Sequence, residues 1–64
     1  MQGFTRQLKK LLSDAGCYFV RYGKGDHEIW FSPVSGREVT VDGKILSRHT
    51  ANAALKQAGL PKAF

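Results

Sequence analysis

The chain has 64 residues, and its ten Lys/Arg against five Asp/Glu give a formal net charge of +5 at pH 7. A chain this short makes one domain, residues 1–64, whose thin core excludes a pocket that encloses an organic cofactor. The positive charge favours a polyanionic partner such as nucleic acid, although many small basic proteins bind nothing anionic.

The first predicted element is a helix over residues 5–15. Thr5 can cap its start, and Gly16 suits the left-handed position just past its end. Its apolar residues follow the three-to-four spacing of a helix with one buried side: Leu8, Leu11, Leu12 and Ala15.

Three stretches with strand character follow, at 17–22, 27–32 and 37–41. They are rich in aromatic and β-branched residues. Residues 23–26 and 33–36 separate them at lengths usual for hairpin loops. The simplest connection is an antiparallel three-stranded meander.

The last predicted element is a second helix, capped by Ser47 or Thr50 and ended by Gly59. Its narrow apolar side consists of Ala51, Ala54, Leu55 and Ala58. The predicted fold is therefore α+β in the order α-β-β-β-α. Both helices need cover, so we expect them on one face of the sheet.

Alternation along the strands predicts two sheet faces. One would carry Phe19, Ile29, Phe31, Val39 and Val41. The other would carry Tyr18, Val20, Tyr22 and Trp30. Two helices cannot cover both faces, so we expect exposed aromatics that suit a partner protein or base stacking, or that simply remain exposed.

His27 is the first candidate for chemistry. It follows Gly25 and Asp26 in a turn, and Arg21 and Lys24 bring positive charge nearby. Asp26 could orient the imidazole and help it exchange protons near pH 7. A single histidine in a turn is also a common surface residue, so chemistry alone leaves both interpretations open.

A second cluster stands at the start of the second helix, where Lys44, Arg48 and His49 could contact a phosphate. The alternative is a solvated helix start. Cys17 is the one cysteine, which excludes an internal disulfide and suits a reducing cytoplasm. One Cys and two separated His do not make a zinc site, and neither a P-loop nor paired carboxylates are present. We therefore expect no metal and no cofactor.

The stretches "AGCYFVRYGKGDHEIWFSP", "REVTV" and "ALKQAGL" together resemble the HicA family of bacterial toxins, and the element order resembles a double-stranded-RNA-binding fold. The family pattern has a Gly ending the first helix, an Arg late in the first strand, a Gly-Ser-His turn and a final Lys-Gln-Ala-Gly. Here Gly16, Arg21, Gly25, His27 and residues 56–59 occupy those places.

The resemblance implies a small metal-independent endoribonuclease that cleaves mRNA and is held by a HicB-type antitoxin. It implies that His27 is the catalytic residue. The phosphate contacts that we expect around it are Arg21, Lys24, Lys44 and Arg48. A non-catalytic RNA-binding module of the same fold is the alternative, and a plain protein-interaction domain is a third. No apolar run is long enough to span a membrane and no secretory signal is evident, so we expect a cytoplasmic protein.

Two departures from the family pattern bear on the site. Asp26 stands where serine is usual, which places a negative charge beside a phosphate site or supplies a group that activates His27. The lead into the second helix lacks the prolines of many members and brings in His49, a candidate second acid/base group.

Overall fold

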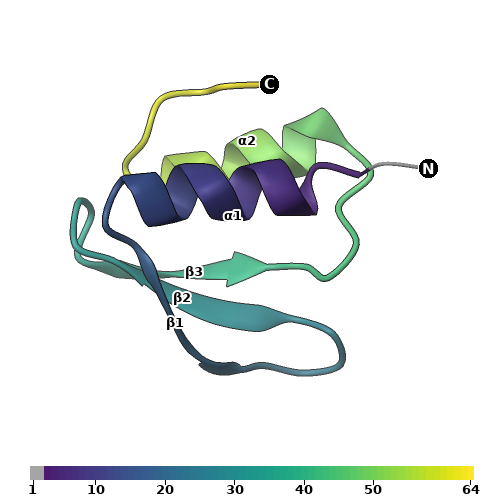
Figure 1. The fold of residues 1–64 in the computed structure, drawn as a ribbon, viewed down its shortest axis with the longest axis horizontal. Helices are drawn as coiled ribbons and strands as arrows, with labels where there is room; N and C mark the ends of the chain where they lie inside the picture. Colours follow the sequence, from purple (N-terminus) through teal and green to yellow (C-terminus); the bar gives the residue numbers. More distant parts are fainter. Residues whose placement is uncertain (1–2) are drawn as a thin grey trace.

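The computed structural model describes residues 3–64 as two helices and three strands in the predicted order. They are α1 (Thr5–Asp14), β1 (Tyr18–Tyr22), β2 (Glu28–Ser32), β3 (Arg37–Val41) and α2 (Arg48–Gln57). The strands form an antiparallel sheet in the order β1-β2-β3. Both helices lie on one face of it, side by side (Figure 1). This α+β arrangement confirms the predicted fold and is consistent with a double-stranded-RNA-binding-like one.

The helix ends show which predicted caps form. Gly16 has φ +90° just after α1, as expected for the residue that ends the helix. Thr5 does not cap α1: Phe4 is the N-cap residue, and no side chain caps it. Ser47 is the residue that caps α2, accepting a hydrogen bond from the backbone N of His49 at 3.1 Å. Within residues 3–64, neither helix has the length and apolar character needed to cross a bilayer.

Thr5 instead joins α1 to the segment after β3. Its hydroxyl donates to the carbonyl oxygen of Asp42 at 3.3 Å and accepts from the backbone N of Ile45 at 2.9 Å. The backbone N of Phe4 also donates to the Ile45 carbonyl, at 2.7 Å. The prediction failed because a partner distant in sequence took the hydroxyl. The start of α1 is thereby held against the β3–α2 connection.

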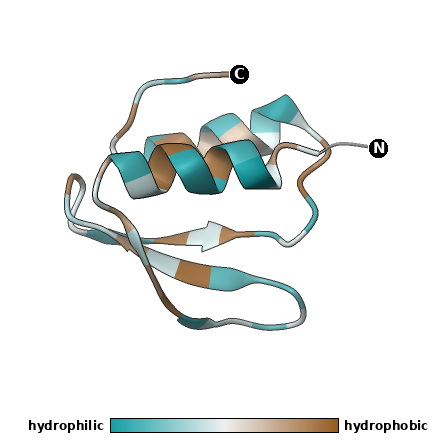
Figure 2. Ribbon diagram, viewed as in Figure 1, coloured by the Kyte–Doolittle hydropathy of each residue, from teal (hydrophilic) through white to brown (hydrophobic). Residues whose placement is uncertain are grey.

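The core lies between the two helices and the sheet. Both predicted helical stripes face it, and hydrophobic and hydrophilic segments alternate along the helices (Figure 2). The buried apolar residues are Leu8, Leu12, Cys17, Trp30, Val39, Val41, Ile45, Ala51, Ala54, Leu55 and Ala58. Ser32 is buried among them, and its hydroxyl donates to the Ala58 carbonyl at 2.7 Å, tying the end of β2 to the end of α2.

The predicted division of the strands into faces is wrong. Trp30 pairs with Val39 across β2 and β3. Only 8% of Trp30 is exposed, so it belongs to the helix-covered face. Partners across a ladder share a face, so Ile29 and Phe31 lie on the outer face instead. The predicted and the observed faces of β2 differ by a shift of one residue relative to β3. Alternation within a strand does not show which of these two registers forms.

A polar link on the covered face follows from the same register. Glu28 accepts hydrogen bonds from Trp30 Nε1 and from Lys9 Nζ on α1, both at 2.9 Å. These two bonds, with Trp30 first, hold the pKa of the Glu28 carboxyl below its ordinary value. Glu28 therefore connects α1 to β2 directly beside the turn that carries His27.

Candidate active site

His27 lies in the β1–β2 turn, immediately before β2. The turn is closed by two backbone hydrogen bonds, from Gly23 N to the His27 carbonyl at 2.8 Å and from His27 N to the Lys24 carbonyl at 3.2 Å. Gly25 takes φ +67°, a conformation that glycine adopts without strain. The imidazole is therefore carried by a defined turn on the sheet rather than by a free loop.

The imidazole of His27 contacts Asp42, a residue that the sequence analysis did not select. Nε2 of His27 lies 2.7 Å from Oδ1 of Asp42, and the two form an ion pair when the imidazole is protonated. The register explains the encounter: Glu28 pairs with Val41, so the residue before Glu28 lies across from the residue after Val41. A correct strand alignment was the one signal that could have identified Asp42.

Asp26 lies against the other ring nitrogen. Its Oδ1 is 3.5 Å from Nδ1 of His27, too long for a hydrogen bond. Nδ1 is buried and has no hydrogen-bond partner, whereas 44% of the imidazole side chain is exposed. The half-exposed ring thus has its Nδ1 buried and its Nε2 against Asp42.

Gly43 allows the two segments to approach. A Cβ at this position would lie 2.9 Å from Oδ2 and 3.0 Å from the backbone oxygen of Asp26. Real Cβ atoms are essentially never found closer than 3.0 Å to another residue's atoms, so only glycine fits here without displacing the turn. The Asp42-Gly43 pair therefore supplies the carboxylate beside His27 and the space for Asp26, the residue before it.

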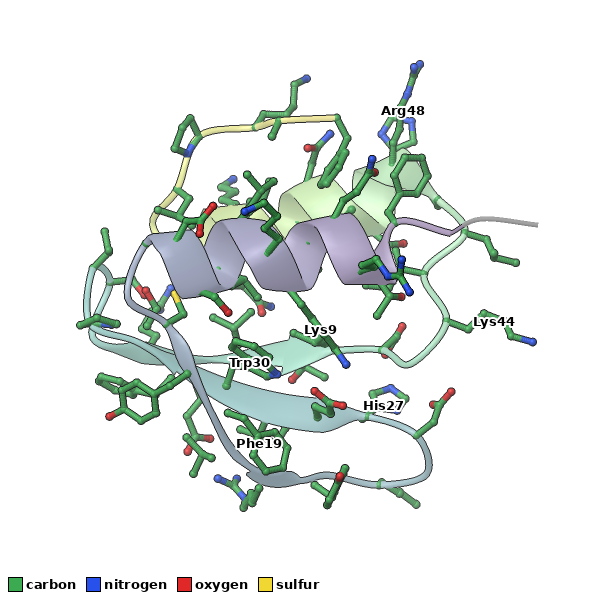
Figure 3. All side chains as sticks on the ribbon, in the orientation of Figure 1. Lys9, Phe19, His27, Trp30, Lys44 and Arg48 are labelled. Atoms are coloured by element: carbon green, nitrogen blue, oxygen red, sulfur yellow. The ribbon has the colours of Figure 1, made fainter. Side chains whose placement is uncertain are left out.

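A basic groove of about 420 Å³ adjoins this pair. Its lining, which defines the basic groove below, is Gly3, Thr5, Arg6, Gly43, Lys44, Ile45 and Leu46. Lys44 was a predicted phosphate contact, and Arg6 was not. Figure 3 shows His27 and Lys44 at the same end of the molecule, where the β1–β2 turn meets the β3–α2 connection. The groove combines backbone polar groups with two cations, which suits an anionic ligand.

The other predicted phosphate contacts do not line the basic groove. Arg21 on β1 makes a two-pronged ion pair with Glu38 on β3, at 2.9 and 3.2 Å. This pairing raises the pKa of Arg21 and lowers that of Glu38. Arg48 points away from His27 (Figure 3). Lys24 is exposed on the turn itself.

His49 belongs to a different groove. That groove is lined by His49, Asn52, Ala53, Lys56, Leu60 and Lys62, and includes neither His27 nor Asp42. The structure therefore does not bring the two histidines together. Asp42, rather than His49, is the titratable side chain next to Nε2 of His27.

A metal site does not form from these side chains. No group of three or more His, Cys, Asp or Glu residues within residues 3–64 could hold an ion. Asp26 and Asp42 lie against different nitrogens of His27, so the three side chains do not converge on one point. What this end of the molecule offers is an imidazole, a carboxylate and nearby cations.

A family model described as HicA toxin of bacterial toxin-antitoxin matches residues 5–60 of the chain. The match includes α1, the whole sheet, His27, Asp42, the β3–α2 connection and α2. No curated protein matches the chain at a significant level, and no solved structure does.

Proposed function

Since the chain belongs to the HicA family of toxins of bacterial toxin–antitoxin systems, we propose that it is an endoribonuclease that cleaves mRNA with His27 as its catalytic residue. Family membership makes the chain a toxin with an antitoxin as its partner. We propose further that this antitoxin is of the HicB type and that the toxin acts in the cytoplasm. The observation that carries the proposal is the 2.7 Å contact between His27 Nε2 and Asp42 Oδ1, beside the basic groove.

The chemistry is an intramolecular transesterification. A base takes the proton of the ribose 2′-hydroxyl, and the 2′-oxygen bonds to the adjacent phosphorus. The bond from phosphorus to the 5′-oxygen breaks, and an acid protonates that oxygen. The products are a 2′,3′-cyclic phosphate and a 5′-hydroxyl, and DNA is excluded because it lacks the nucleophile. A positioned acid or base contributes about 10²–10⁴ in rate.

Such a reaction needs two groups that exchange protons, and the His27–Asp42 pair supplies both. The imidazole and the carboxylate approach one another at Nε2, and both side chains are partly exposed. In the proposed mechanism, Asp42 takes the 2′-hydroxyl proton and the imidazolium of His27 protonates the leaving 5′-oxygen. Asp26 has no step in it, because it lies 3.5 Å from the buried Nδ1.

Cations of the basic groove stabilise the charge that develops on the phosphate. Lys44 and Arg6 line the groove next to Gly43, and Lys24 projects from the turn before His27. Arg21 and Arg48 remain predicted phosphate contacts that lie away from the pair. Arg21 would have to release Glu38 before it could bind RNA.

The decisive experiment incubates the purified chain and His27→Ala with RNA in EDTA and follows cleavage and RNA retention separately. We expect the parent to cut RNA to cyclic-phosphate ends and the variant to lose about 10²–10⁴ of that rate. Retention of RNA by both proteins without any cutting would refute the nuclease and indicate an RNA-binding module. If the parent does not bind RNA even at low salt, where phosphate contacts are strongest, both the nuclease and the RNA-binding module are refuted.

A second comparison tests Asp42. Asp42→Asn and Asp26→Asn remove the same charge on opposite sides of one ring, so they differ only in which nitrogen loses a neighbour. We expect Asp42→Asn to lower kcat by at least about 10²-fold with KM unchanged. Asp26→Asn should leave kcat within a few-fold. If Asp42→Asn changed kcat as little as Asp26→Asn does, Asp42 would have no part in the mechanism and His27 would keep its role.

A further inference from the structure

Strand β1 is an exposed edge. All five of its residues, Tyr18–Tyr22, are exposed, in contrast to the partly buried strands β2 and β3. Four of the five are large and apolar or aromatic, with 73% of Tyr22 and 55% of Tyr18 exposed. Within residues 3–64, β1 pairs with β2 alone, so its other side presents unpaired backbone groups.

Apolar side chains stand on both faces of this edge. Phe19 and Tyr22 contact each other with ring centroids 5.0 Å apart, and Tyr18 contacts Phe31 at 5.7 Å. The register places Phe19 and Tyr22 opposite Trp30 and Glu28, on the helix-covered face, and Tyr18 opposite Phe31 on the outer one. The helices do not reach far enough to cover β1 (Figure 1).

Exposed edge strands are normally protected by charges, prolines or bulges, because they pair with other chains. β1 has a register shift between Phe19 and Arg21 but no proline. Its one charged side chain, Arg21, is neutralised by Glu38 on β3. Apart from that one irregularity, the edge retains the free backbone and the apolar surface that favour association with another strand.

We propose that β1 is the docking edge for the antitoxin, which adds one of its own strands alongside Tyr18–Tyr22. Strand addition supplies main-chain hydrogen bonds, and the side chains on alternate faces supply specificity. RNA fits this edge poorly, because its only cation is already paired with Glu38. A second copy of the chain would bring together two molecules of charge +5, whereas an acidic partner gains from that charge.

The position of this edge also connects antitoxin binding to the candidate active site. β1 runs directly into the turn that carries Lys24 and His27, and Gly23 N is bonded to the His27 carbonyl. A partner strand on β1 that extends past Tyr22 therefore follows the chain toward that turn. Acidic residues there would meet Lys24 and compete with RNA phosphates.

The test measures binding to the purified cognate antitoxin of this toxin, with His27→Ala as the parent so that both proteins can be produced. Tyr22→Lys places a charge on the edge, and Val34→Lys, on the β2–β3 turn, is the matched control. We expect Tyr22→Lys to raise the Kd at least about tenfold. The control should change it less than about twofold.

Amide hydrogen exchange reports on the backbone itself. If a strand is added, exchange of amides within residues 18–22 slows in the complex, whereas in the free chain the outward-facing ones exchange rapidly. Unchanged exchange in β1, equal Kd values for Tyr22→Lys and Val34→Lys, or the absence of a complex would each overturn the proposal. So would a β1-dependent dimer of the chain alone in sedimentation.

This experiment is independent of the nuclease proposal. Tyr22→Lys, made with His27 intact, is expected to retain the parent rate of RNA cleavage while escaping inhibition by the antitoxin. If neither the parent nor Tyr22→Lys cleaves RNA, the proposed function fails, and the binding results still decide whether β1 is the docking edge. If Tyr22→Lys cleaves RNA but is inhibited like the parent, the docking edge fails alone.

Discussion

Gly43→Ala perturbs the candidate active site without removing any of its functional groups. The added Cβ would meet Asp26, in the turn that carries His27, at 2.9 Å from Oδ2 and 3.0 Å from the backbone oxygen. The side-chain oxygen can rotate away. The backbone oxygen cannot, because the turn is closed by hydrogen bonds between Gly23, Lys24 and His27. The turn as a whole must therefore recede.

The size of that displacement predicts the size of the effect. Ordinary van der Waals contact begins at 3.4 Å, so the backbone oxygen at 3.0 Å must move by about 0.4 Å. A misplacement of 1 Å at a catalytic group costs about 10²-fold in rate. Scaled in proportion on a logarithmic axis, a 0.4 Å displacement of His27 from Asp42 lowers kcat by about sixfold. Overpacking of this kind also costs about 1–3 kcal/mol of stability.

The assay compares kcat for RNA cleavage at saturating RNA, at a temperature where every variant is folded by circular dichroism. Gly36→Ala is the control. Gly36 has φ +70° in the β2–β3 turn, and a Cβ there meets nothing within 4 Å. Alanine in that conformation costs about 1–2 kcal/mol, so stability falls by a similar amount for a conformational reason. We expect kcat of this control to equal that of the parent.

Two results would refute the reasoning. If Gly43→Ala cleaves RNA as fast as the parent, the approach of Asp42-Gly43 to the turn does not control the position of His27. If Gly36→Ala loses as much activity as Gly43→Ala, the loss reflects stability rather than geometry. Imidazole ¹⁵N shifts of His27 provide a separate readout, and we expect them to change in Gly43→Ala alone.

Three further predictions concern stability and RNA affinity. The Glu28 carboxyl, to which Trp30 donates, has a lowered pKa, so its ionised form adds stability above the ordinary pKa of 4.5, and this stability is lost as pH falls below that value. In urea unfolding, Glu28→Gln should therefore lose less stability than the parent between neutral and acidic pH. Ser32→Ala leaves the Ala58 carbonyl without its donor and should cost about 1–3 kcal/mol in the same assay, whereas an unchanged midpoint would contradict the buried bond. Lys44→Ala should reduce the slope of log K for RNA against log salt by about one, and an unchanged slope would exclude Lys44 as a phosphate contact.

Much of the fold follows from patterns within each segment. The spacing of Leu8, Leu11 and Leu12 is a local property of α1, and Gly16 ends the helix because it accepts positive φ. Strand propensity and loop length together predicted a three-stranded antiparallel sheet. The turn with His27 was likewise predictable, because its glycines and charged residues are neighbours in the sequence.

The candidate site was only half predictable for the same reason. His27 and Lys44 were selected from the residue types around them. Asp42, one residue after β3, carries no such signal and becomes a partner of His27 only through the β2–β3 register. No partner for Arg21 was evident from the sequence, and it is paired with Glu38 on β3, beyond the whole of β2.

The sequence by itself determined the elements, their order and the histidine in its turn, because these depend on neighbours within a few residues. Tertiary structure alone decided which strand residues face the helices, that Trp30 is buried, and that β1 remains exposed. It also brought Asp42 to Nε2 of His27 and Arg21 to Glu38. The exposure of β1 follows from its place at the edge of the sheet, beyond the helices. The other outcomes depend on register, and a shift of one residue, which local propensity does not detect, reverses the face of every side chain in a strand.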